Sequence, residues 1–302
     1  MRILVLACLL SSATVATAAE QCGEGGVWLQ ILGSGGPEIT DRRASASYVL
    51  WVDDQAKVLV DPGPGSSLRF EEAGARFEDL DAILLSQLSA DHTSDLTAFL
   101  GGSEYVERKR SLAVLGPATD AAADTTIQRF LERAIGRDGL YPHLASLLDA
   151  RPGGYQLRPM GVPSTGSRRW SRFGTETVRV ASIPVHHGHT PAVAWRVEAK
   201  GLTVTFAGDF NNESNLMQSF AKGTDALVIH HAVGEGVRGT LADEYVTPTQ
   251  IGRIAAEANA RMLILGHRMM RTRGIETQTE AIIRRQFANA LIFANDLECW
   301  GL

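Results

Sequence analysis

The chain has 302 residues, which is long enough for one large domain or for two smaller ones. Hydrophobic residues make up 44% of it and charged residues 21%, and these values exclude a disordered, collagen-like or coiled-coil protein. The formal net charge of -5 argues against a globally basic nucleic-acid-binding protein, although it leaves local basic patches open.

Residues 1–19 have the pattern of a secretory signal peptide. Arg2 precedes an apolar run from Ile3 to Leu10, and small residues of the Ala-x-Ala type follow at positions 16–19. The run is far shorter than the roughly 20 residues that cross a bilayer, which disfavours a membrane anchor. A lipoprotein signal with Cys8 as the lipidated residue is the other alternative. We expect cleavage after residue 18 or 19, no transmembrane segment, and an exported protein that is periplasmic or secreted.

Cleavage of this segment removes Cys8 and leaves Cys22 and Cys299 near the two ends of the mature chain. Paired cysteines tend to form bridges in the oxidising compartments that exported proteins reach. We therefore predict a Cys22–Cys299 disulfide that ties the termini together, with two separate thiols as the alternative.

The first half of the mature chain alternates strands with helices. Periodicity and turn residues predict helices at Thr93–Leu100 and Asp120–Ile135 and strands at Val27–Gly33, Ser47–Val52, Lys57–Val60, Asp81–Leu85 and Leu112–Leu115. Residues 136–176 are rich in Gly, Pro, Arg and Ser, and we interpret them as an irregular insertion or lid.

The second half repeats the strand-rich pattern. Helices are predicted at Thr249–Ala258 and Glu276–Phe287, and strands at Thr177–Val185, Ala192–Ala199, Leu202–Phe206, Asp225–His230, Arg261–Leu265 and Leu291–Ala294. Strands followed by helices in both halves predict two sheets packed face to face with helices outside. No linker is evident, so residues 20–302 are expected to form one domain.

Histidine or aspartate follows a buried strand at four places. These places are Ser86–His92, His186–His189, Gly208–Asp209 and Gly266–His267. Side chains on loops at one edge of a rigid sheet can converge on a single point. Imidazole and carboxylate groups are ligands for zinc, iron and manganese, so the pattern indicates a metal site.

In this order and spacing, several segments resemble the landmarks of the metallo-β-lactamase superfamily. The match is closest to its ribonuclease Z-like and arylsulfatase-like phosphodiesterase branch, and it involves residues 27–37 (VWLQILGSGGP), 58–63 (VLVDPG), 82–95, 185–191, 206–209 and 263–267. The resemblance implies an α/β fold: an αββα sandwich of two mixed β-sheets with helices on the outer faces and the active site along one edge.

The family signature His-x-His-x-Asp-His falls on residues 87–92, QLSADH. Asp91 and His92 match its last two positions, whereas Gln87 and Ser89 stand where the family has histidines. Further along the chain, the metal ligands that the resemblance implies are His187, Asp209 and His267.

The resemblance divides these ligands between two metal sites. The second site is complete, with Asp91, His92, Asp209 and His267, and Asp91 is also the implied catalytic residue. The first site retains only His187 and Asp209, because an amide oxygen binds a hard cation weakly and a neutral hydroxyl binds it even less well. We expect the first site to be weak or empty and the protein to bind one divalent ion, zinc, with manganese or iron as alternatives.

Other polar residues flank these ligands. Strand alternation points His186 away from the site, whereas His189, His230 and His231 are candidates for contact with it or for supporting its ligands. Arg268, Arg271 and Arg273 follow His267 and either hold an anionic substrate or form a solvated basic loop.

The sequence therefore predicts an exported metal-dependent hydrolase of phosphodiester or ester bonds, with a small-molecule or anionic substrate. Nucleic acid is an unlikely partner on this hypothesis, because an exported protein does not meet precursor transfer RNA. The alternative is a catalytically impaired relative that binds a ligand or a partner protein, because two of the family's imidazoles have been replaced.

Overall fold

The computed structural model describes residues 22, 25–119, 126–149 and 154–302. The predicted signal peptide and the first part of the predicted helix Asp120–Ile135 lie outside this range. Within it, no helix is both long enough and apolar enough to cross a membrane.

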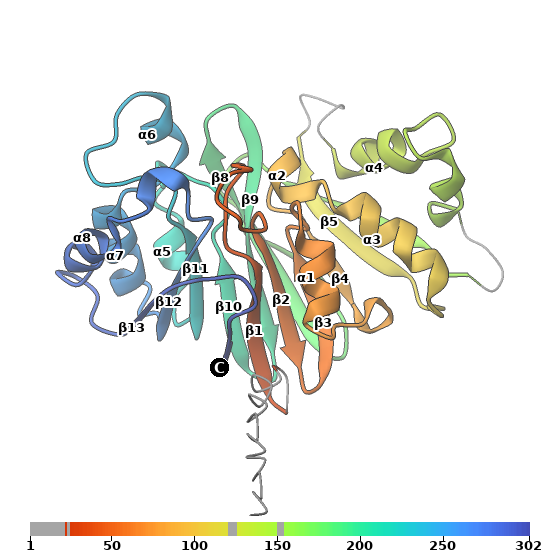
Figure 1. Cartoon of the computed structure of the whole chain (residues 1–302), viewed down its shortest axis with the longest axis horizontal. Coiled ribbons are helices and arrows are strands. Elements are labelled where there is room, and N and C mark those ends of the chain that lie inside the picture. The colour runs from red at the N-terminus through yellow and green to blue at the C-terminus, as the bar shows by residue number, and fades with distance from the viewer. Residues whose placement is uncertain (1–21, 23–24, 120–125, 150–153) are drawn as a thin grey trace, which may run out of the picture.

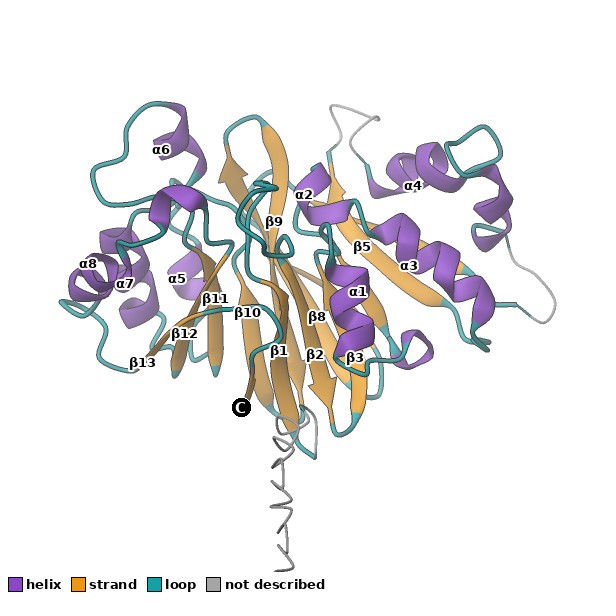
Figure 2. Ribbon diagram, in the orientation of Figure 1, coloured by secondary structure: helices purple, strands orange, loops and turns teal. Residues whose placement is uncertain are grey.

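Two seven-stranded sheets form the centre of the molecule, and helices lie on both outer faces (Figures 1 and 2). The first sheet has the order β14-β1-β2-β3-β4-β5-β6; it is antiparallel from β14 to β3 and parallel from β3 to β6. Its strands are β1 (Val27–Gly33), β2 (Ser47–Val52), β3 (Gln55–Val60), β4 (Ala82–Leu84), β5 (Leu112–Ala118), β6 (Leu157–Pro163) and β14 (Cys299–Gly301).

The second sheet has the order β13-β12-β11-β10-β9-β8-β7; it is parallel from β13 to β10 and antiparallel from β10 to β7. Its strands are β7 (Trp170–Gly174), β8 (Val178–His187), β9 (Thr190–Ala199), β10 (Leu202–Phe206), β11 (Ala226–His230), β12 (Met262–Gly266) and β13 (Ala290–Phe293). The αββα sandwich of two mixed sheets that the sequence predicts is therefore confirmed.

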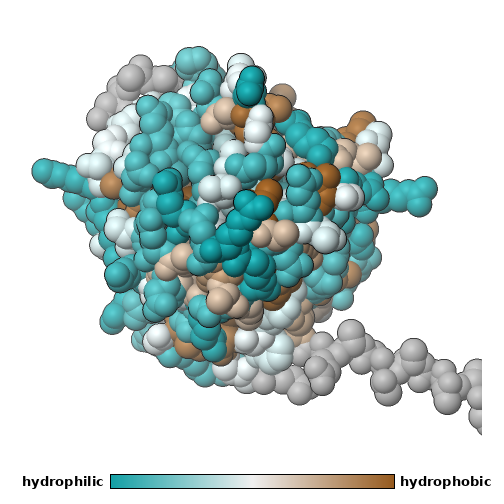
Figure 3. Space-filling view, turned by 90° about the vertical axis from the view of Figure 1, so that its left-hand side faces the viewer, coloured by the Kyte–Doolittle hydropathy of each residue, from teal (hydrophilic) through white to brown (hydrophobic). Residues whose placement is uncertain are grey.

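Alternating side chains of each strand face the other sheet or the outer helices. Tyr48, Trp195 and Phe206 belong to the core between the sheets. Apolar side chains of α1 (Ser66–Glu72), α3 (Leu96–Gly102) and α4 (Ile127–Ile135) form the core outside the first sheet. Those of α5 (Met217–Phe220), α7 (Pro248–Glu257) and α8 (Glu276–Ile283) form the core outside the second. The outward side of this second helix layer is largely hydrophilic (Figure 3).

Residues 136–176 differ from the predicted irregular insertion or lid. They contain a 3₁₀ helix at Pro142–Leu147 and both outermost strands of that side, β6 in the first sheet and β7 in the second. β6 contains proline and glycine, and β7 is largely exposed, so neither has the alternating apolar pattern that marks a strand. Edge position explains this composition, because an edge strand has one neighbour and tolerates proline, glycine and charge.

The disulfide predicted between Cys22 and Cys299 is confirmed, with Cα atoms 6.1 Å apart. Cys299 opens β14, which pairs antiparallel with β1 through Gln30 opposite Cys299. The bridge therefore ties Cys22, which precedes β1, to β14, the edge strand of the first sheet.

Reduction of this disulfide should destabilise the protein, because it restores conformational freedom to an unfolded chain whose cross-linked cysteines are 277 residues apart. We expect the free energy of unfolding in urea to fall by about 2–4 kcal/mol. A double variant, Cys22→Ser with Cys299→Ser, should unfold like the reduced protein whether or not reductant is present. Equal midpoints for the oxidised and reduced protein would contradict the prediction.

Candidate metal centre

The five residues predicted as metal ligands come together at the edge of the sandwich that lies uppermost in Figure 1. Asp91 and His92 lie in the short helix α2 (Ala90–Thr93), which follows β4. Three of the predicted ligands come from the second sheet: His187 ends β8, Asp209 follows β10, and His267 follows β12. Because β10 and β12 run parallel, the loops after them reach the same edge of the sheet.

Asp209 is the centre of this group, and its side chain is only 2% exposed. His92 Nε2 lies 3.2 Å from its Oδ2, and the Nε2 atoms of His187 and His267 each lie 3.8 Å from the same oxygen. On the other side, His230 Nδ1 lies 2.6 Å from Oδ1. Burial alone raises the pKa of Asp209, but the charge of His267 and the hydrogen bonds from His230 and His92 hold it well below its usual range.

Asp91 completes the group from the first sheet. Its Oδ2 lies 3.3 Å from His267 Nε2 and 3.5 Å from His92 Nε2, and its side chain remains 16% exposed. Burial raises the pKa of Asp91, but the hydrogen bond from His267 and the charge of His92 lower it below the usual value. Asp91 is therefore ionised at neutral pH and within reach of solvent.

The tightest set of donor atoms includes one residue outside the predicted ligands. Donor atoms of His92, Asp209, His230 and His267 all lie within 4.8 Å of one another, and all four side chains are buried. His230 is the last residue of the buried strand β11. The sequence signal for His230 is its position. It ends a buried strand that lies between β10 and β12, and predicted ligands follow both of these strands at the same edge.

His230 uses both ring nitrogens on protein groups. Nδ1 contacts Asp209 Oδ1 at 2.6 Å, and Nε2 lies 3.1 Å from the hydroxyl of Tyr48. Burial lowers the pKa of His230, which favours a neutral ring, and burial raises the pKa of Tyr48, which keeps its hydroxyl protonated. Tyr48 therefore donates to Nε2 and His230 donates from Nδ1, so His230 orients the carboxylate of Asp209.

Asp61 supports His92 from behind. This aspartate follows β3, and its Oδ2 lies 3.0 Å from His92 Nδ1. Its two carboxylate oxygens also accept hydrogen bonds from the backbone and hydroxyl of Ser86, both at 2.6 Å. Carboxylates placed in this way fix the orientation of a ligating imidazole and leave its other nitrogen toward the centre.

Gln87 and Ser89 occupy the places where the family has histidines. The amide Nε2 of Gln87 donates to Asp209 Oδ2 at 2.6 Å. Its Oε1 and the hydroxyl of Ser89 are buried and have no hydrogen-bond partner in the part of the chain that the structure describes. The amide therefore satisfies an oxygen of the carboxylate that the resemblance assigns to both metal ions.

His187 lies at the rim of the centre. Its Nδ1 donates to the backbone oxygen of Glu244 at 3.0 Å, which turns Nε2 toward Asp209. Glu244 ends α6 (Thr240–Glu244), and the ring of Tyr245 packs edge-on against His187, with centroids 5.3 Å apart. The segment around α6 therefore sets the direction of this histidine.

The remaining histidines lie away from the centre. His186 points outward, as expected, with Nε2 3.6 Å from Glu213 Oε2. His189 is exposed in the turn between β8 and β9. His231 is fully buried, and its Nε2 lies 3.1 Å from the Thr279 hydroxyl.

The arginines after His267 divide into two groups. Arg268 is buried and bound to Glu276 Oε1 at 2.6 Å and to the backbone oxygen of Ala294 at 3.1 Å, so the hypothesis that it holds substrate is wrong. Arg271 and Arg273 are exposed.

Comparison with known proteins shows which family the chain belongs to. A family model described as a beta-lactamase superfamily domain matches residues 56–268. Ribonuclease Z of Mycobacterium bovis is 28% identical over 284 residues, which cover 89% of this chain and 96% of that protein. Ribonuclease Z of a Mycobacterium species (strain KMS) is 31% identical over 207 residues, 67% of each chain.

Solved structures show the same fold. The metallo-beta-lactamase fold protein YhfI from Bacillus subtilis has a TM-score of 0.70 at 18% identity, with 91% of this chain and 98% of that chain covered. The short form of human tRNase Z has a TM-score of 0.69 at 15% identity, with 90% and 98% covered. The chain belongs to the metallo-β-lactamase superfamily, and within it to the ribonuclease Z-like branch.

The burial of His231 predicts a loss of stability in acid. Burial lowers the pKa of His231 to about 4, whereas the unfolded chain has a histidine pKa of about 6.5. Between these values the unfolded state binds more protons, so stability is complete above pH 6.5 and falls as the pH drops toward 4. Replacing His231 with Gln should remove roughly 2–3 kcal/mol of this pH dependence, measured by urea unfolding across the range.

The exposed His189 provides the matched control for this experiment. His189→Gln should leave the pH dependence of unfolding unchanged, because it replaces an exposed side chain and removes no buried group. A wild-type profile that matches the His231→Gln profile between pH 4 and 6.5 would show that His231 does not titrate as inferred.

Proposed function

We propose that the protein is a metal-dependent hydrolase of phosphodiester bonds that works with one divalent ion, zinc, with manganese or iron as alternatives. The observation that carries the proposal is the convergence of Asp91, His92, Asp209 and His267 from two sheets on one edge of the sandwich. The ribonuclease Z relatives support the phosphodiester as the bond that is cleaved.

The residues present fit a divalent cation. Two carboxylates, Asp91 and Asp209, carry two negative charges, and the imidazoles of His92 and His267 complete a set of four donors. His267 Nδ1 has no hydrogen-bond partner among the described residues, and its Nε2 is directed at both carboxylates. A bound ion would supply Lewis-acid polarisation of the scissile phosphoryl oxygen.

A single ion is favoured by the hydrogen bond between Gln87 and Asp209. The 2.6 Å contact places an N–H donor against Oδ2, the oxygen closest to His92, His187 and His267. An N–H group cannot coordinate a cation, and His187 is the one imidazole left of the three that the resemblance assigns to the first site. In place of a second cation, Gln87 therefore gives Asp209 a neutral N–H donor.

Asp91 is the proposed proton acceptor. It is ionised, retains solvent access, and is held through Oδ2 by His267. A carboxylate in this position can accept the proton of the attacking water while His267 fixes its direction.

A hollow of about 630 Å³ opens beside Asp91 and offers space for substrate. The loop at residues 37–45 and helix α1 line it. Ile39 is 97% exposed and Leu68 is 57% exposed on its walls. Arg42 also lines it and forms no ion pair with any described residue. The exposed apolar side chains and the arginine in these walls suit an anionic diester that carries an apolar substituent.

The ribonuclease relatives change one expectation from the sequence. Nucleic acid was expected to be an unlikely partner, and that expectation is withdrawn because the curated relatives are ribonucleases. RNA therefore belongs among the phosphodiesters to be tested.

We also propose that the protein is exported. The pattern of residues 1–19 and the Cys22–Cys299 disulfide support this, because structural disulfides persist in oxidising compartments. Amino-terminal sequencing of the protein isolated from its native cells should find Ala19 or Glu20 first. A chain that still begins at Met1 would contradict export by cleavage.

The hydrolase proposal predicts both metal content and turnover. The purified mature protein should contain about one equivalent of divalent metal and should hydrolyse bis(p-nitrophenyl) phosphate. Asp209→Ala should abolish turnover and metal retention, because it removes the carboxylate that all the other ligands surround. Metal analysis by mass spectrometry and p-nitrophenol release measure the two effects, and a short RNA serves as the second substrate.

Neighbouring histidines provide the matched controls. His267→Ala should lose metal, whereas His186→Ala should keep metal and activity because its ring faces outward. A double variant, Gln87→His with Ser89→His, should bind a second equivalent of metal. No metal and no turnover with added zinc, manganese or iron would instead favour the ligand- or partner-binding alternative that the replacement of two imidazoles suggests.

A further inference from the structure

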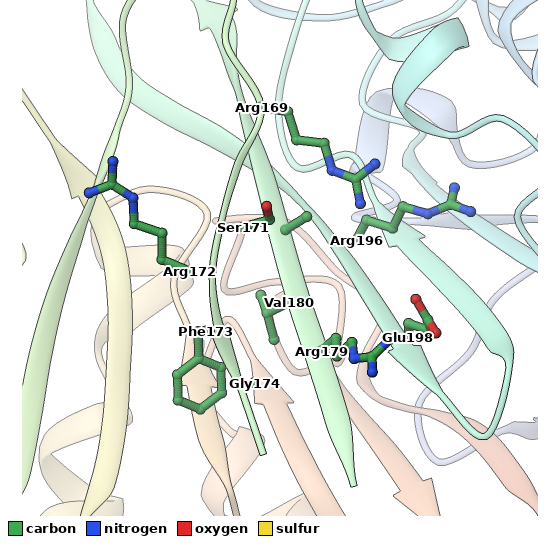
Figure 4. Close-up of a pocket in the computed structure, with 10 residues that line it drawn as sticks. Arg169, Ser171, Arg172, Phe173, Gly174, Arg179, Val180, Arg196 and Glu198 are labelled. Carbon is green, nitrogen blue, oxygen red and sulfur yellow. Dashed lines mark ion pairs between the residues drawn. The ribbon is translucent and has the colours of Figure 1, made fainter. Parts of the chain in front are cut away.

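The outer face of the second sheet carries a pocket beside the core that the sheet forms with α5 and α7. That core includes side chains of β8, β9, β11 and β12, and residues of β7, β8 and β9 line the pocket, whose volume is about 410 Å³ (Figure 4). The charged residues among those that line it are Arg169, Arg172, Arg179, Arg196 and Glu198. This set has four cations and one anion, and it shares no residue with the metal centre.

Strand register places three of these side chains on one face. Arg179 lies opposite Glu198, and Ala181 lies opposite Arg196 in the β8–β9 pair. The small side chain of Ala181 leaves space between the longer ones. Arg169 precedes β7, and its guanidinium points toward that of Arg196, whereas Arg172 extends on the other side of β7 (Figure 4). Arg169 and Arg196 therefore form the cationic part of the pocket.

The guanidinium of Arg196 is fixed in position. It donates to the backbone oxygen of Phe220 at 3.1 Å and to the Thr203 hydroxyl at 3.2 Å. Arginine has five N–H donors, so three of them remain without a partner among the described residues. Arg169 lies over the Phe220 ring, with Cζ 5.8 Å from the centroid.

Neither of these two cations has a counter-ion. In the part of the chain that the structure describes, the one carboxylate of the pocket, Glu198, pairs with Arg179 at 3.8 Å, and no ion pair involves Arg169 or Arg196. Burial lowers the pKa of Arg196, and the nearby charge of Arg169 lowers it further, against smaller opposing effects of Glu198 and Asp225. The two guanidinium groups carry like charges and repel each other. An anion bound between them would offset this repulsion.

We propose that this arginine pocket, formed by Arg169, Arg179, Arg196 and Glu198, binds the phosphate dianion of a small phosphate monoester between Arg169 and Arg196. A phosphate monoester carries a charge of about -1.5 to -2 at pH 7, which matches two unpaired guanidinium groups. The forked N–H donors of arginine suit phosphate oxygens. The volume lies within the range of small-molecule sites. The inference does not depend on the proposed hydrolase activity.

Calorimetric titration of the full chain tests the proposal. Metal is first removed by chelation, so that phosphate cannot bind through an ion at the Asp209 centre, and ionic strength is held constant with chloride. Orthophosphate and adenosine monophosphate are the two probes. We expect saturable binding of one equivalent per chain, and about tenfold or greater weakening in Arg169→Gln, because one set of charge-assisted hydrogen bonds is lost.

Two further variants sharpen the test. Arg285→Gln removes one exposed charge on the C-terminal side of α8 and should bind both probes as the wild type does. Arg196→Lys keeps the positive charge but loses the paired N–H donors of the guanidinium, and should also weaken binding. Equal affinities of the two probes would identify the bare anion as the ligand, and tighter binding of adenosine monophosphate would identify an esterified one. Absence of saturable binding of either probe, or equal affinities of Arg169→Gln and Arg285→Gln, would overturn the proposal.

Discussion

The centre of this protein depends on one buried carboxylate. Asp209 is withdrawn from water, and an isolated buried carboxylate would take up a proton rather than keep its charge. It stays ionised because Gln87, His92 and His230 each place a nitrogen within 3.2 Å of its oxygens. These three residues come from both sheets. The hydrogen bonds to the carboxylate of Asp209 therefore hold the two sheets in position relative to each other. A shift of either sheet would leave a buried charge without these partners.

The same carboxylate also accepts the amide of Gln87. Its Oδ2 faces His92, His187 and His267, and the amide of Gln87 competes for that oxygen. A neutral amide partly compensates the charge of Asp209 without coordinating anything. Gln87, which stands where the family has a histidine, thus keeps the buried carboxylate hydrogen-bonded without offering an imidazole.

The sequence predicted the parts of the fold whose periodicity is apolar. Strands β2 and β11 are buried along their whole length and β1 along most of it, so hydrophobicity marks them. The edge strands β6 and β7 were missed because an edge tolerates proline, glycine and arginine. The ligand positions followed from the resemblance, but the role of His230 did not, because its function depends on a hydrogen bond to Tyr48, a residue distant in sequence whose hydroxyl lies 3.1 Å away only in the folded chain.

The backbone strain at the centre also could not be predicted from the sequence. Asp61 and His267 have φ values of 49° and 46°, a left-handed conformation that costs about 1–2 kcal/mol for a residue with a side chain. Ser86 holds the carboxylate of Asp61, and the backbone of Arg268 donates to Ser34 at 2.7 Å beside His267. Arg268 is in turn bound through its side chain to Glu276. Arg268 therefore holds the strained turn from which His267 points at Asp91 and Asp209.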